Sequence, residues 1–170
     1  MIIRVNGFEP QRPFYMSEDA TLIGDVRFGE KCSVWFKTVL RGDIKHIELG
    51  NYTNIQDMSV GHVTEELPVI LGNYVTVGHG VIMHGCTVND CTLLGMGATI
   101  LDNTVIGRGC IIAAGTVIKE NSIIPDFSLV AGVPGKIKKT MTPGVIETLK
   151  EHAMSYVKYA EDMKNAQIID

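Results

Sequence analysis

A period of six residues is the feature that most constrains how this chain can fold. Between residues 88 and 130 a branched aliphatic residue returns at every sixth position, and a small residue stands two places before each one. A long α-helix needs apolar residues about every 3.6 positions and an amphipathic strand needs them at every second position, so a strict six fits neither. It fits a short strand and a turn, repeated along the chain. The aliphatic positions are Val88, Leu94, Ile100, Ile106, Ile112, Ile118, Ile124 and Val130.

The same period is present in three earlier stretches, and the sequence holds 18 repeats in total. If three strand-and-turn units close one triangular coil, the aliphatic side chains of successive coils stack inside a prism, with neighbouring strands about 4.8 Å apart. We therefore predict an all-β fold with a C-terminal α-helix, in which the β part is a parallel β-helix of about six triangular coils. The earlier stretches are residues 22–40, 49–61 and 71–83, and the period breaks near 41–48, 62–70 and 84–88.

The segments on either side of the repeats have a different character. Residues 1–16 alternate apolar and polar side chains and contain two prolines, which indicates an N-terminal strand or arm. The repeats occupy residues 17–135, and residues 136–170 are expected to form a turn and a helix within the same single domain. Thr142 and Pro143 are typical of a helix start. Apolar residues follow at helical spacing, so we expect one amphipathic helix to pack on the β-helix.

Composition agrees with many short strands and excludes several classes of function. Ile, Val and Thr make up 49 of the 170 residues, with 18 glycines and only 11 aromatic residues. β-Branched residues favour strands, and glycine favours turns. The net charge of −4, with no basic run beyond residues 136–139, argues against binding of nucleic acid. No apolar run approaches the ~20 residues of a membrane span, so no membrane partner is expected.

The cysteines indicate a reducing compartment. Four cysteines form no CxxC pair, and the chain opens without the basic and apolar regions of a signal peptide. We therefore expect a cytoplasmic protein with reduced thiols. Cys32, Cys86 and Cys110 fall at or near the small interior positions of the repeat and are expected to be inert. Cys91 lies outside this register, which makes it the one candidate for a reactive thiol.

Three of the five histidines occupy related positions in the repeat. His62 and His84 each follow an aliphatic register position, and the 22 residues between them equal one coil of 18 plus an insertion of four. Their side chains are therefore expected to stack on one edge of the prism. His79 lies on the preceding side of its coil, so it can join them only from a neighbouring subunit. A symmetric homotrimer supplies that arrangement three times.

Three imidazoles are the ligand set that Zn²⁺ uses when it keeps a fourth position open for water. Such a metal lowers the pKa of its water to about 7, which makes hydroxide available near neutral pH. Imidazoles also accept other divalent metals, so Fe²⁺ and Co²⁺ are alternatives to zinc. The simpler interpretation is that His62, His79 and His84 form ordinary hydrogen bonds at the surface or between subunits.

A resemblance to a known family rests on several short stretches around these histidines. They resemble the gamma-class carbonic anhydrase family, and the resemblance covers roughly residues 8–160. It implies a left-handed β-helix, a homotrimer, and metal ligands His62 and His84 from one subunit with His79 from the next. The stretches are Arg41-Gly42-Asp43, Asn54-Ile55-Gln56-Asp57, His62, Gly78-His79, His84-Gly85-Cys86 and Gly95-Met96-Gly97-Ala98.

The resemblance also implies roles for residues near the metal. Arg41 and Asp57 would form an ionic cluster at the subunit interface, while Gln56 and Asp43 would orient the bound water. Tyr156, on the expected helix, matches a tyrosine of the family whose hydroxyl approaches the site. The alternative for the charged residues is a purely structural ion pair, and the alternative for Tyr156 is packing in the core.

The activity that the resemblance implies is attack of metal-bound hydroxide on CO₂ to give bicarbonate, the carbonate dehydratase reaction of a lyase. The loop after His62 is short and offers only Glu65 and Glu66. The best-studied branch of the family carries a proton-transferring glutamate on a longer loop, so weak activity is expected here. Three alternatives remain: a hexapeptide acyltransferase that uses coenzyme A, a metal-dependent thioesterase, and a structural subunit held together by metal.

Overall fold

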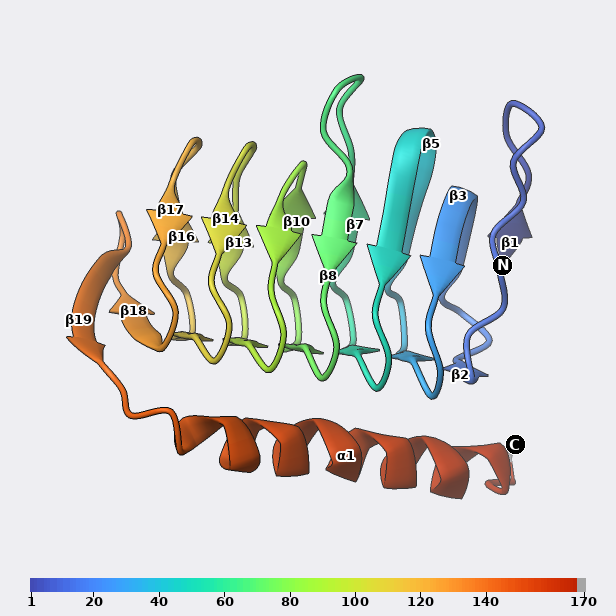
Figure 1. The fold of residues 1–170 in the computed structure, drawn as a ribbon. Coiled ribbons are helices and arrows are strands. Elements are labelled where there is room, and N and C mark those ends of the chain that lie inside the picture. Colours follow the sequence, from blue (N-terminus) through green and yellow to red (C-terminus); the bar gives the residue numbers. More distant parts are fainter. Residues whose placement is uncertain (168–170) are drawn as a thin grey trace.

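The computed structural model describes residues 1–167, so the last three residues of the predicted 136–170 segment lie outside the described part of the chain. The chain winds into a parallel β-helix, and a single helix, α1 (Val145–Lys164), runs back beneath the β-helix along its length (Figure 1). The predicted fold class is therefore confirmed, including the left-handed β-helix.

The strands form two hydrogen-bonded sheets that wrap around three faces. One sheet has the order β16-β13-β10-β7-β5-β8-β11-β14-β17 and also contains β1 and β3, because β5 turns a corner and belongs to two faces. The other has the order β19-β18-β15-β12-β9-β6-β4-β2. The strands are β1 (Ile2–Ile3), β2 (Tyr15–Met16), β3 (Thr21–Phe28), β4 (Ser33–Val34), β5 (Val39–Leu49), β6 (Asn54–Ile55), β7 (Val60–His62), β8 (Val69–Leu71), β9 (Thr76–Val77), β10 (Ile82–His84), β11 (Thr87–Val88), β12 (Leu93–Leu94), β13 (Thr99–Ile100), β14 (Val105–Ile106), β15 (Ile111–Ile112), β16 (Val117–Ile118), β17 (Ile123–Ile124), β18 (Ser128–Ala131) and β19 (Lys136–Thr140).

The β-helix has about seven turns, one more than the repeats predict. The difference arises at the N-terminus, where β1 pairs in parallel with β3 and β2 pairs in parallel with β4. These two strands extend the prism although residues 1–16 contain no hexapeptide repeat. At the other end, the expected turn after residue 135 contains a strand, because β19 pairs with β18 in the antiparallel direction.

The repeat builds the core as its spacing predicts. All eight aliphatic positions between residues 88 and 130 are buried, as are the small positions before them except Ser122. A fully buried aliphatic side chain contributes roughly 1.5–3 kcal/mol relative to an exposed one, so the stacked column is the main source of stability. Cys32, Cys86 and Cys110 are buried within it as expected, and Cys91, the candidate for a reactive thiol, is also buried, with only 4% exposed.

Helix α1 packs on the sheet that contains β2, β4 and β9. It buries Leu149, Ala153, Val157 and Ala160 on one side. The helix begins at Val145, just beyond the Thr142–Pro143 signal, and the N-cap residue Gly144 makes no side-chain capping bond. Within residues 1–167, no helix is long and apolar enough to cross a membrane.

Two corners of the prism carry polar side chains that bridge successive coils. The histidine corner contains residues 41–46, 62–68, 84–86 and 101–103. The asparagine corner contains residues 50–52, 72–74, 89–91, 107–109 and 125–127. Both are corners at which a polar side chain of one coil reaches back to the coil before it. At the asparagine corner, four side-chain oxygens each accept a hydrogen bond from a backbone N–H group of the preceding coil. The pairs are Asn51 with the N–H of Glu30 (2.8 Å), Asn73 with that of Asn51 (2.9 Å), Asp90 with that of Asn73 (2.7 Å) and Asp126 with that of Arg108 (3.0 Å).

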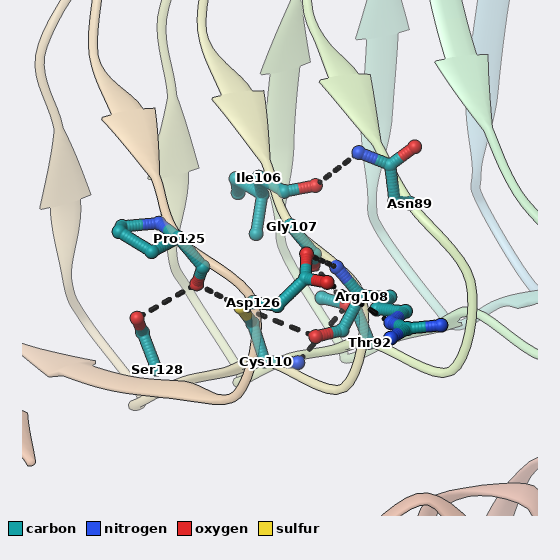
Figure 2. Close-up of polar contacts among 9 residues, drawn as sticks. All are labelled: Asn89, Thr92, Ile106, Gly107, Arg108, Cys110, Pro125, Asp126 and Ser128. Atoms are coloured by element: carbon teal, nitrogen blue, oxygen red, sulfur yellow. Dashed lines mark hydrogen bonds and ion pairs between the residues drawn. The ribbon is translucent and has the colours of Figure 1, made fainter. Parts of the chain in front are cut away.

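Figure 2 shows the last of these contacts in detail. Asp126 accepts from the backbone N–H of Arg108 at 3.0 Å and from its Nε at 2.9 Å. The same view shows Thr92 Oγ1 donating to the carbonyl of Gly107 at 2.9 Å, another bond between successive coils. The coils are thus joined at their corners by side chains as well as along their strands by backbone hydrogen bonds.

Candidate metal centre

His62 and His84 lie one above the other at the histidine corner. His62 ends β7 and His84 ends β10, and these parallel strands pair with His62 directly opposite His84. Their ring centroids are 5.0 Å apart, and Nδ1 of His62 lies 3.0 Å from Nε2 of His84. The stacking that the spacing predicts is therefore present, because the insertion after His62 bulges outward and leaves the strand register intact.

Each of these two imidazoles also contacts a carboxylate on its other ring nitrogen. Asp43, within β5, places Oδ1 3.2 Å from Nε2 of His62. Asp102, one coil beyond His84, places Oδ1 in hydrogen-bond contact with Nδ1 of His84. The four side chains form a continuous row in the order Asp43, His62, His84, Asp102.

Proton counting in this row indicates a missing positive charge. The row contains three contacts between nitrogen and oxygen atoms or between two nitrogen atoms. Each contact is a hydrogen bond only if one of its two atoms carries a proton, because otherwise two lone pairs face each other. Two neutral imidazoles carry two N–H groups, so one of the three contacts has no proton. A third proton would make the pair cationic, but burial, followed by the nearby charge of Arg41, lowers the pKa of His62 in spite of the opposing effect of Asp43. A cation between the two rings would supply the missing charge.

A divalent metal fits the place of that third proton. With Nδ1 of His62 and Nε2 of His84 as ligands, each outer nitrogen keeps its N–H and donates to its own carboxylate, which is the usual surrounding of a metal-binding histidine. Two nitrogens bound at 2.0–2.1 Å to a tetrahedral metal lie about 3.3 Å apart, close to the observed 3.0 Å. Within residues 1–167, no group of three histidine, cysteine or acidic side chains converges on one point, so this subunit offers two ligands and not three.

His79 lies at the remaining corner of the prism and has the same type of partner. Its Nδ1 is 2.7 Å from Oδ2 of Asp57, and the side chain is 45% exposed. The Asp57 contact leaves Nε2 of His79 directed away from its own carboxylate and available to another molecule. The three predicted histidines thus share one pattern, in which a carboxylate holds one ring nitrogen and the other is left for a ligand.

Arg41 and Asp43 are brought together as a pair beside His62. Arg41 Nη1 donates to Oδ2 of Asp43 at 2.6 Å, and Arg41 lies opposite His62 in the strand register. Burial opposes ionisation of Asp43, but hydrogen bonds from Arg41, its own backbone N–H and His62 hold the pKa of the carboxyl below its ordinary value. Asp43 is therefore an anion that both a guanidinium and an imidazole share. The expected cluster of Arg41 with Asp57 is not formed within this subunit, where Asp57 contacts His79 instead.

Gln56 and Tyr156 both line a cavity of about 270 Å³ that also contains His79 and His152. Gln56 is 4% exposed and its Nε2 donates to Oδ1 of Asn54 at 3.2 Å. Tyr156 packs edge-on against Trp35, with ring centroids 5.8 Å apart, and burial raises the pKa of its phenol. Tyr156 therefore combines a packing role with a position at the edge of the cavity.

Asp102 is the residue at this site that sequence reasoning missed. A signal for it was present, because it follows His84 by one coil of 18 residues, the spacing that places side chains above one another. His152, on α1, is exposed, but it also lines the cavity with His79 and contacts Tyr156, with ring centroids 5.6 Å apart. A helical residue has no register in the repeat, so the six-residue period offered no means of placing it.

The left-handed parallel β-helix defines a class of protein, the hexapeptide-repeat β-helix, and the row of imidazoles and carboxylates lies at one of its corners. A sequence profile of the family "Bacterial transferase hexapeptide (six repeats)" matches residues 85–120. The solved structure of a hexapeptide transferase family protein from Anaplasma phagocytophilum superimposes with a TM-score of 0.89 and 34% identity, covering 95% of this chain and 96% of that one.

Sequence relatives identify the family within that class. A probable carbonic anhydrase of Methanocaldococcus jannaschii is 50% identical over 150 residues, which is 88% of this chain and 94% of the relative. Gamma carbonic anhydrase 2, a mitochondrial protein of Arabidopsis thaliana, is 39% identical over 86% of this chain, which spans 55% of the length of the plant protein. The chain belongs to the gamma-carbonic-anhydrase-like family of hexapeptide-repeat proteins.

Proposed function

We propose that this chain is a gamma-class carbonic anhydrase that hydrates CO₂ to bicarbonate as a homotrimer with zinc sites between subunits. The observation that carries the proposal is the row Asp43, His62, His84, Asp102, in which neutral imidazoles would leave one of the three contacts without a proton. The relatives named as carbonic anhydrases support the choice of CO₂ as substrate.

The ligands would be Nδ1 of His62 and Nε2 of His84 from one subunit, together with His79 of the partner subunit. A divalent metal held by three imidazoles supplies a water that loses a proton near pH 7, and so a nucleophile for CO₂. Zinc is proposed because three neutral imidazoles with one open position are its usual catalytic ligand set, and imidazoles also accept Fe²⁺ and Co²⁺.

The surrounding residues of the chain would orient what reacts. The bond from Gln56 to Asn54 fixes the plane of the buried amide, so its oxygen can accept a hydrogen bond from water in a constant direction. Asp43 is held by Arg41 and directs the ring of His62. Asp57 directs the ring of His79 through its contact with Nδ1, and Tyr156 closes one side of the cavity.

The trimer is supported by an exposed apolar surface between the two corners that carry histidines. This surface consists of Met58, Val60, Ile82 and Met96, which are 61%, 38%, 46% and 59% exposed. Covering these side chains would bring His79 of one subunit toward His62 and His84 of the next, because the surface lies between them. A cytoplasmic location is proposed from the four free, buried thiols, a usage typical of a reducing compartment.

The experiment that tests this proposal is complementation between two inactive variants. His79→Ala and His84→Ala each remove one ligand from every site of a trimer, so each alone is expected to lose bound zinc and CO₂ hydration. When the two are coexpressed in equal amounts, one interface in each mixed trimer has all three histidines, which restores about one quarter of all sites by random assembly. Bound zinc and stopped-flow CO₂ hydration would both recover to that fraction.

Three results would contradict the proposal. Stoichiometric zinc in either single variant would mean that the three histidines do not form the site. Failure of the coexpressed mixture to recover zinc, although mixed trimers are isolated by differently tagged subunits, would rule out ligands from two subunits. Wild-type protein that binds zinc as proposed but never hydrates CO₂ would leave the metal site in place and overturn the activity.

A further inference from the structure

We infer that Asp102 is a positioning residue of the metal centre, which keeps the proton of His84 on Nδ1 and thereby leaves Nε2 directed at His62 and the metal. The inference rests on the proposed function for the identity of the ligand, but the pairing of Asp102 with His84 is a property of the chain itself. A carboxylate in this position fixes the tautomer and orientation of the ring and increases the basicity of the nitrogen that binds metal.

The backbone brings Asp102 to His84 by the geometry of the coil. Residue 102 follows β13, and β13 pairs directly with β10, which ends at His84. The backbone N–H of Asn103 donates to the carbonyl of Gly85 at 2.9 Å, which ties the two coils together right beside the contact. The carboxylate of Asp102 therefore approaches His84 from a fixed platform and not from a loop of its own.

Gly85 leaves the space that this approach needs. Its φ of +48° lies in the left-handed region, which glycine adopts without strain. A Cβ atom at this position would lie 3.0 Å from Oδ1 of Asp102 and 3.1 Å from Cβ of Leu67. Any larger residue would therefore press on the same carboxylate oxygen that contacts His84.

Asp102 differs from the carboxylate on the other histidine of the pair in having no cationic partner. Asp43 divides its charge between His62 and the guanidinium of Arg41. Among residues 1–167, the only charged or chargeable group paired with Asp102 is His84. The whole negative charge of Asp102 is therefore directed at one imidazole, that of His84.

The test measures zinc affinity by competition with a chromogenic chelator in the wild type, Asp102→Asn, Asp102→Ala and Asp126→Asn. Asp126→Asn is the matched control, because it removes the same charge from an exposed aspartate at the asparagine corner that also reaches back one coil. Loss of such a partner weakens metal binding about 10–100-fold. We expect that loss in both Asp102 variants, larger for alanine than for asparagine, and none in the control.

A second measurement needs no metal. The ¹⁵N shifts of the His84 ring in the metal-free protein report which nitrogen carries the proton, and we expect Nδ1–H in the wild type and a mixture of tautomers in Asp102→Ala. Thermal unfolding and the mass of the assembly check that each variant is folded. Nε2–H on His84 in the wild type, or unchanged zinc affinity in both folded Asp102 variants, would overturn the inference while the metal site stands. Wild-type protein that binds no zinc, but shows the expected tautomers, would overturn the proposed function and leave the Asp102 pairing intact.

Discussion

At both the histidine corner and the asparagine corner, a polar side chain contacts the preceding coil, but the group that it contacts differs. At the asparagine corner an amide or carboxylate oxygen accepts a hydrogen bond from a backbone N–H of the preceding coil at four places, at 2.7–3.0 Å. At the histidine corner Asp102 reaches the preceding coil in the same way, but its partner is the imidazole of His84. The difference lies in the donor and not in the architecture.

This comparison explains how a repetitive fold acquires a site. A backbone N–H is already fixed by the coil, so the oxygen that meets it adds stability and nothing else. An imidazole N–H can move to the other ring nitrogen, so the oxygen that meets it also decides which nitrogen remains free for a ligand. The fold supplies the reach at both corners, and at one of them the partner is a histidine, whose other ring nitrogen could hold a metal.

The largest effect is expected from closing the space between coils at the asparagine corner. In Gly107→Ala, the new Cβ would lie 2.5 Å from the backbone N of Asp126 and 2.6 Å from its Oδ1, and backbone cannot move aside cheaply. Overpacking typically costs roughly 1–3 kcal/mol of the free energy of unfolding and occasionally more, and we expect about 3 kcal/mol here because the contact is with backbone. Urea denaturation measures the loss, and we expect the zinc content of the folded protein to be unchanged.

Gly80→Ala is the control for this change. Gly80 has a φ of +67°, and no atom lies within 4 Å of the position that a Cβ would take, so the substitution adds backbone strain without a clash. Strain alone costs about 1–2 kcal/mol. Equal destabilisation by the two variants would contradict the view that close contact between coils limits position 107 to glycine.

A smaller effect is expected from Asp90, and it separates the two corners. The chain itself uses both asparagine (Asn51, Asn73) and aspartate (Asp90, Asp126) to accept from backbone N–H groups, so one oxygen is sufficient there. Asp90→Asn is expected to change stability by less than about 0.5 kcal/mol, and Asp90→Ala to cost about 1 kcal/mol. Neither should change zinc affinity, in contrast to the same two substitutions at Asp102.

Thermal denaturation and the chelator competition measure both quantities on the same samples. If Asp90→Asn weakens zinc binding as much as Asp102→Asn, the effect at Asp102 comes from the loss of a negative charge anywhere on the prism. The distinction between the corners would then fail.

The parts of the fold that follow the six-residue period could be predicted from the sequence. The period predicts the buried column, the coil and the stacking of His62 on His84, because insertions change the number of residues and not the strand register. The first coil could not be found in this way, since β1 and β2 are short strands without the repeat and are recognised only by pairing with β3 and β4. The strand β19 was missed for the same reason.

At the site, the histidines were identified by register, whereas their partners depend on where side chains point. The family resemblance implies that Asp57 and Arg41 lie near the metal, but not that Asp57 contacts His79 and Arg41 contacts Asp43 within one subunit. The partner of each histidine lies at a corner of the prism. There the chain changes direction, so side chains no longer alternate between the interior and the surface. Asp102 escaped notice because an aspartate at a corner resembles the purely structural oxygens of the asparagine corner.

The smallest effect concerns the reactivity of the thiols. It tests whether the asparagine corner excludes a reagent from solution. Cys91 lies at this corner, is only 4% exposed, and burial raises the pKa of its thiol in spite of the charge of Lys150. Cys32 is fully buried, and burial raises the pKa of its thiol to about 11, so very little of the reactive thiolate forms at pH 8. We expect neither to react with a thiol reagent at pH 8 within minutes in the native protein, and all four cysteines to react in urea. Mass spectrometry of the labelled peptides distinguishes the sites. Rapid labelling of Cys91 alone would mean that this corner opens in solution. Its glycine and asparagine contacts would then contribute less stability than the comparison of Gly107→Ala with Gly80→Ala is expected to show.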